Sequence, residues 1–93
     1  MSNRNYANGR DREYQAMRYL EKWGYVCVRA AGSHGLWDVI GRNRDRFVLA
    51  QVKYNCKPSA AELREMVDDP VPRGTIKMVL IYRFRKEVEV VYL

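Results

Sequence analysis

Residues 47–53 read FVLAQVK, a run of strand-forming residues that turns from apolar to polar at its far end. Side chains of a strand alternate between the two faces of its sheet, so Leu49, Gln51 and Lys53 share one face. An amide and an amine on a face that begins apolar indicate a strand that runs out of the core into a polar site. We therefore expect this strand to organise both the fold and the function of the chain.

The segments on either side of this strand show helical and strand patterns in turn. One helix is expected over residues 13–23, opened by a capping box at 8–11 and stopped by Gly24, and a second helix opens with a capping box at Ser59. The order αβββαββ predicts an α/β fold of the α+β sandwich type, with a central mixed β-sheet flanked by helices, in a single domain over residues 1–93. The five expected strands cover residues 25–31, 37–41, 47–54, 75–84 and 88–93.

The composition favours a polyanionic partner. Seventeen Lys and Arg against eleven Asp and Glu give a net charge of +6, which suits DNA, although a membrane surface or an acidic protein would also accept it. No apolar run is long enough to span a membrane and the N-terminus is unlike a signal peptide, so we expect a cytoplasmic protein. Cys27, Cys56 and the single His34 form neither a disulfide framework nor a zinc pattern.

Glu13 lies on the face of the first helix that should pack on the sheet. A buried carboxylate needs a partner because an unpaired buried charge is costly. The alternative is that Glu13, near the start of the helix, reaches water and favours the helix dipole. The buried stripe expected on this face consists of Ala16, Met17, Leu20 and Trp23.

Asp38 interrupts an apolar stretch that otherwise reads as a strand. If the connection to the next strand is an even-length loop centred between Arg44 and Asp45, Asp38 faces Gln51 across the ladder. Opposed side chains have Cβ atoms about 4.5–5.5 Å apart, close enough to share one cation. An odd-length loop would set Asp38 opposite Ala50 instead and separate the two polar residues.

Together, Asp38, Gln51 and Glu13 offer three oxygen ligands to a hard cation, and Lys53 lies two residues beyond Gln51 on the same face. Magnesium prefers oxygen ligands and keeps several waters, so it suits a site with few protein ligands. A bound cation beside a lysine is an arrangement that favours phosphodiester hydrolysis.

A helical Glu13, the segment VRAAGS at 28–33, Asp38 and the strand segment QVK at 51–53 follow one another in an order that resembles the PD-(D/E)xK nuclease superfamily. More narrowly, the order is similar to that of the archaeal-type Holliday junction resolvases and their phage or viral relatives. The likeness covers residues 9–53, about half of the chain. It implies a restriction-endonuclease-like fold and a Mg²⁺-dependent endonuclease that resolves Holliday junctions or other branched DNA.

The resemblance also implies specific residue roles. It assigns Mg²⁺, with Mn²⁺ as the expected substitute, to Glu13, Asp38, Gln51 and the backbone carbonyl of Val52, and it makes Lys53 the catalytic lysine. It implies that Ser33 contacts the scissile phosphate or assists catalysis. The residues expected to bind DNA are Arg10, Arg12, Arg29, Ser33 and His34. The implied assembly is a homodimer in the cytoplasm of a prokaryotic cell or of a phage-infected host.

Two positions depart from the family pattern. The family has Glu where this chain has Gln51, and an amide oxygen ligates Mg²⁺ without bringing a charge, so we expect weaker metal binding. Tyr14 stands where the family has an arginine, and Arg10, Arg12 or Arg18 is the expected replacement.

Three functions therefore remain open at this point. The first is a structure-specific junction endonuclease, and the second is a general repair or nicking nuclease of the same fold. The third is a non-catalytic DNA-binding relative, with Gln51 as the sign of lost activity. Asp38, Lys53 and Glu13 are each awkward in a core without a metal, which favours an enzyme.

Overall fold

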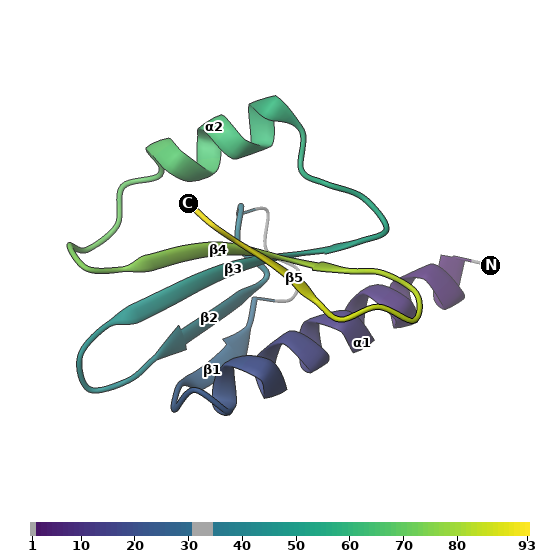
Figure 1. The fold of residues 1–93 in the computed structure, drawn as a ribbon, viewed down its shortest axis with the longest axis horizontal. Helices are drawn as coiled ribbons and strands as arrows, with labels where there is room; N and C mark the ends of the chain where they lie inside the picture. The colour runs from purple at the N-terminus through teal and green to yellow at the C-terminus, as the bar shows by residue number, and fades with distance from the viewer. Residues whose placement is uncertain (1, 31–34) are drawn as a thin grey trace.

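The computed structural model describes residues 2–30 and 35–93 of the chain, with side chains from residue 10 onward, and in it a five-stranded sheet lies between two helices (Figure 1). The predicted order αβββαββ and the predicted class, a mixed sheet flanked by helices, are confirmed. The elements are α1 (Ser2–Glu21), β1 (Val26–Arg29), β2 (Val39–Arg42), β3 (Phe47–Tyr54), α2 (Ala60–Asp68), β4 (Ile76–Tyr82) and β5 (Glu89–Tyr92).

The strands follow the order β1-β2-β3-β4-β5 across the sheet, so β3 is central. Only β3 and β4 run parallel, and α2 makes the crossover between them; the other neighbours are antiparallel. Figure 1 shows α1 along one face of the sheet and α2 over the opposite face. The C-terminal strand β5 pairs with β4 and forms one edge of the sheet.

The first helix differs from its prediction at both ends. It begins at Ser2 instead of after a capping box at residues 8–11, because no proline interrupts that segment and Asn and Gly only lower helix propensity, by up to about 1 kcal/mol each. Trp23, expected in the buried stripe, is 68% exposed because the helix has already ended at Glu21. Gly24 takes a φ of +90°, as a residue that stops a helix does.

The two sheet faces bury different cores. On the α1 side Ala16 and Leu20 pack on Val48 and Ala50 of β3. On the α2 side Met66 packs with a second group of apolar side chains, which includes Trp37, Val79 and Ile81. None of the described helices is long and apolar enough to cross a membrane.

Both ends of α2 are held by side chains. At its start, Ser59 and Glu62 form the predicted capping box: the Ser59 Oγ accepts from the Glu62 N–H at 3.1 Å, and Glu62 Oε1 accepts from the Ser59 N–H at 2.9 Å. At its end, the Lys77 ammonium donates to three carbonyls, those of Met66, Val67 and Asp69, at 2.7–3.0 Å. These contacts fix both ends of α2, and Glu62 in its first turn reaches Lys53 near the far end of β3, where the candidate site lies.

The register between β2 and β3 is the one that an even-length loop predicts. Val39 pairs with Ala50 and Arg42 with Phe47. Gly41 allows this close packing, since a Cβ there would lie 2.8 Å from Val48 Cγ1. The register brings the chain just before β2 beside the polar end of β3.

Candidate active site

Asp38 is held at the end of the β2–β3 ladder by its backbone and by its side chain. Its N–H donates to the Ala50 carbonyl at 2.9 Å, and its own carbonyl accepts from the Ala30 N–H at 2.9 Å. Its Oδ2 accepts from the Val52 N–H at 2.8 Å. Asp38 is thus bonded to both sequence neighbours of Gln51, which places the two predicted ligands side by side.

The environment of Asp38 opposes its ionisation. Burial raises the pKa of the Asp38 carboxyl above its ordinary value, and the nearby Glu62 carboxylate adds to the rise. The hydrogen bond from the Val52 N–H and the Lys53 ammonium act in the opposite direction. A cation bound here would relieve the cost of holding this charge.

Gln51 is the one polar residue among the buried side chains of the described part of the chain, at 7% exposure. Its Nε2 donates to the Leu36 carbonyl at 3.3 Å, and its Oε1 is buried without a hydrogen-bond partner. Buried polar atoms are nearly always paired, so an acceptor left open calls for an explanation. A bound cation or water would supply the missing partner.

Lys53 is held by a residue that the sequence did not single out for the site. Its Nζ lies 2.9 Å from Glu62 Oε2, in an ion pair whose side chains are 22% and 37% exposed. The hydrogen bond from Lys53 is the main cause that holds the pKa of Glu62 below its ordinary value, and the Ser59 N–H contributes further. Glu62 therefore accepts a hydrogen bond from the Ser59 N–H with Oε1 and contacts the Lys53 ammonium with Oε2.

The sequence marks Glu62 only as part of a capping box. That pattern is local, whereas the contact with Lys53 depends on how the crossover lays α2 over the sheet. The one available signal is that the box lies within ten residues of the lysine.

Glu13 lies on the α1 side of the sheet and is already paired. The Arg29 Nη1 contacts Glu13 Oε1 at 3.1 Å, and the Arg29 guanidinium also stacks over the Tyr14 ring at 5.0 Å. Arg29 itself is the cross-strand partner of Val39, the residue after Asp38. Arg29 thus joins Glu13 and Tyr14 of α1 to the strand that pairs with β2 beside Asp38.

The oxygen donors of Asp38 and Gln51 suit a hard cation that keeps most of its waters. Asp38 Oδ1 makes no hydrogen bond to any described residue, and the buried Gln51 Oε1 also lacks a hydrogen-bond partner. Over residues 10–30 and 35–93, however, no group of three His, Cys, Asp and Glu side chains is arranged to hold a metal ion. Glu13 is therefore not gathered with other acids into such a group.

The predicted DNA-binding residues that the structure describes lie in α1 and at the end of β1. The Arg12 guanidinium stacks 4.4 Å from the Tyr54 ring and donates to Gln15 Oε1 at 3.0 Å. Arg10 is exposed. Ser33, expected at the scissile phosphate, and His34, expected to contact DNA, lie outside the described residues.

At the level of sequence, no family model and no curated protein matches the chain. Among solved structures, Hjc, a Holliday junction resolvase from the archaeal hyperthermophile Archaeoglobus fulgidus, is similar with a TM-score of 0.73 and 21% identity. The match covers 91% of this chain and 72% of the resolvase chain. The chain therefore has a fold like that of an archaeal resolvase, a mixed five-stranded sheet with two helices.

Proposed function

We propose that this chain is a metal-dependent DNA endonuclease that acts on Holliday junctions or similar branched DNA. The observation that carries the proposal is the meeting of a partly buried carboxylate, an amide oxygen without a hydrogen-bond partner and a lysine at one end of β3. These are Asp38, Gln51 and Lys53. The fold likeness to a resolvase and the net charge of +6 support the same substrate class.

Asp38 and Gln51 would hold Mg²⁺, with the Val52 carbonyl and Glu13 as further proposed ligands. When bound, such a cation neutralises phosphate charge and lowers the pKa of a bound water. Because Gln51 brings no charge, we expect binding that needs more Mg²⁺ than a site with two carboxylates would need.

Lys53 would place its positively charged ammonium beside the scissile phosphate of the DNA. Its ammonium has three donors, and one is occupied by Glu62. The remaining N–H groups are left to donate to a phosphate oxygen or to the attacking water, and to stabilise charge as it develops on the phosphate.

Glu62 would act as a positioning residue for Lys53. A lysine on a flexible stem loses precision unless its head group is held, and small misplacements of a catalytic group are costly. The carboxylate is itself fixed by the capping box of α2. Glu62 also places a negative charge near Asp38, in the part of the site where Gln51 lacks one.

The substrate and the assembly follow from the same proposal. Two symmetric cuts in a four-way junction require two active sites, so we propose a homodimer. Arg10, Arg12, Arg29, Ser33 and His34 are the proposed DNA contacts, and Mn²⁺ is the proposed substitute for Mg²⁺.

The variant Asp38→Asn tests this function. The amide still offers an oxygen to the Val52 N–H but removes the buried charge, so the variant should unfold at the same temperature as the parent or higher. Mg²⁺-dependent cleavage of a synthetic four-way junction should be lost while junction binding stays near the parent level. Cleavage at the parent rate would refute the active-site assignment.

A linear duplex of the same sequence is the matched control substrate. Equal cleavage of duplex and junction would remove the specificity for branched DNA while keeping the nuclease. A retained preference for the junction supports the resolvase-type function.

A non-catalytic DNA-binding protein is the second candidate. It is favoured by the burial of Gln51 against the Leu36 carbonyl and by the lack of a three-acid group in the described residues. Junction binding without cleavage at any concentration of Mg²⁺ or Mn²⁺ would decide for this candidate.

A further inference from the structure

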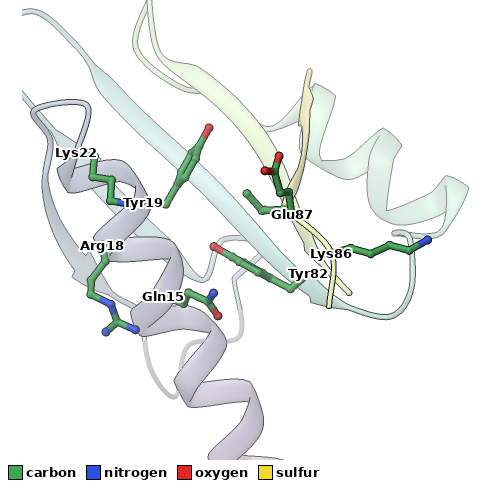
Figure 2. Close-up of a pocket in the computed structure, with 8 residues that line it drawn as sticks. Gln15, Arg18, Tyr19, Lys22, Tyr82, Lys86 and Glu87 are labelled. Atoms are coloured by element: carbon green, nitrogen blue, oxygen red, sulfur yellow. The ribbon is translucent and has the colours of Figure 1, made fainter. Parts of the chain in front are cut away.

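A pocket of about 440 Å³ lies between α1 and the turn that joins β4 to β5, on the face of the sheet away from α2 (Figure 2). Gln15, Arg18 and Lys22 line it from the helix, and Lys86 and Glu87 line it from the turn. Its lining includes none of the proposed catalytic residues, and of the arginines considered above it includes only Arg18, one of the three candidate replacements for the arginine absent at Tyr14.

Tyr82 reaches this pocket from the end of β4. The residue is only 5% exposed, and its hydroxyl has no hydrogen-bond partner among the described residues. Figure 2 shows the hydroxyl end of the ring directed toward α1, between the helix and the turn. A buried hydroxyl without a partner is unfavourable, so its place at a pocket suggests that a ligand completes it.

The protonation state of Tyr82 makes it a donor. Burial raises the pKa of Tyr82 to about 12, in spite of the nearby Arg12 and Arg18, which lower it. At neutral pH the hydroxyl therefore keeps its proton and can donate to an acceptor. Gln15 has its Oε1 occupied by Arg12, which leaves its amide N–H groups as further donors.

The charge around the pocket is positive. Arg18, Lys22 and Lys86 outnumber the single carboxylate of Glu87, and none of the four makes an ion pair with another described residue. In Figure 2 the head groups of Arg18 and Lys86 extend outward, in different directions. Long, flexible side chains of this kind can turn inward when an anion binds.

We propose that this pocket binds a phosphate group of the nucleic-acid backbone, with Tyr82 and Gln15 as hydrogen-bond donors and Arg18, Lys22 and Lys86 as the neutralising charges. The proposal rests on the proposed function, since it takes DNA as the ligand. It adds to that function an anchor outside the candidate active site.

The position of the pocket in the fold is compatible with one substrate that reaches both sites. Tyr82 is the cross-strand partner of Tyr54 on β3, and Tyr54 follows Lys53. The pocket and the candidate active site therefore lie at the same end of the sheet, on opposite faces. A DNA backbone that continues from Lys53 around this end of the sheet would pass Arg12, which stacks on Tyr54, and would then reach the pocket.

Inorganic phosphate is the probe for the pocket itself. In the ¹⁵N-labelled protein, sodium phosphate at constant ionic strength should shift the amide signals of residues 15–22 and 82–88, and Tyr82→Phe should weaken these shifts several-fold. Since the hydroxyl has no protein partner, Tyr82→Phe should unfold at the parent temperature or above it. A marked loss of stability would show that the hydroxyl is structural and would overturn the proposal, as would equal shifts in both proteins.

Binding of a four-way junction at increasing salt tests the DNA ligand. The variant Arg18→Gln/Lys86→Gln should bind more weakly, and its slope of log affinity against log salt should be smaller by about 0.9 for one lost phosphate contact. Glu87→Gln should bind more tightly than the parent, because it removes the one opposing charge. A control that also removes two positive charges, Arg44→Gln/Arg73→Gln in the turns at the other end of the sheet, should keep the parent slope.

The outcomes separate this proposal from the proposed function. Phosphate-dependent shifts with an unchanged junction slope would mean that the pocket takes free phosphate only, which overturns the backbone anchor. A reduced slope in a protein that cleaves no DNA would sustain the anchor and contradict the nuclease.

Discussion

At the C-terminal ends of β3 and β4, the charged groups on the two faces of the sheet differ in whether they have partners. On the α2 face, Lys53 is paired with Glu62 and the Asp38 carboxylate is bound to the Val52 N–H. On the α1 face, the cations of the pocket have no anionic partner among the described residues and the Tyr82 hydroxyl is unsatisfied.

This difference indicates what each face is organised to do. Groups that are ion-paired or hydrogen-bonded are held in place before a substrate binds, and catalysis requires such preorganised positions. Unpaired cations around an open pocket give attraction for a polyanion without fixed geometry. The first face should therefore govern rate and the second should govern affinity.

Glu62→Gln should have the largest effect, and only on the α2 face, because it removes the charge that holds the Lys53 ammonium. Glutamine still serves in a capping box, so α2 should stay folded and thermal unfolding should change little. We expect kcat for junction cleavage to fall about tenfold, while the Kd for the junction stays near that of the parent.

Ser59→Ala is the matched control for this variant. It removes the cap at a cost of about 1 kcal/mol in the free energy of unfolding, but keeps the carboxylate that contacts Lys53. It should be less stable and nearly as active as the parent. If Glu62→Gln lost stability and kept its kcat, Glu62 would be a structural residue only.

Gln51→Glu adds a negative charge to the α2 face and should have the next largest effect. A second carboxylate beside Asp38 should lower the Mg²⁺ concentration for half-maximal cleavage by about tenfold, because affinity for such ions depends on ligand charge. Without Mg²⁺ the variant should unfold at a lower temperature, since it buries an uncompensated charge. Complete loss of cleavage at all Mg²⁺ concentrations would show that the amide has another purpose.

The smallest effect at neutral pH concerns Tyr82 on the other face. Its pKa of about 12 in the folded state is above the ordinary value of 10.0, so its contribution to stability is full below pH 10 and is lost as the pH rises through 12. Relative to Tyr82→Phe, the parent should lose stability over this range only. The pKa can be checked by following tyrosine absorbance as the pH is raised. If every tyrosine ionised at the ordinary pKa, the burial of the Tyr82 hydroxyl would be contradicted.

Much of the fold could be predicted because its signals are local. The segment 47–54 has both strand propensity and alternation, and it forms β3 over those residues. The register that brings Asp38 beside Gln51 follows from the length of one short loop. Ser59 and Glu62 form a complete capping box, which fixes the start of α2.

What the sequence could not give depends on tertiary packing. The early start of α1 reflects a segment with weak helix propensity but no helix breaker, and Trp23 is exposed because it falls just past the helix end. The pairing of Glu62 with Lys53 and of Glu13 with Arg29 requires the angles at which both helices cross the sheet. No spacing along the chain encodes those angles.

The most direct test of the central claim is cleavage of a synthetic four-way junction by the unmodified protein, with and without Mg²⁺. The account predicts cuts in the junction that require Mg²⁺ and little cleavage of the matched duplex. A protein that binds the junction but leaves it intact in Mg²⁺ and in Mn²⁺, or that cleaves equally well in a metal chelator, would contradict it.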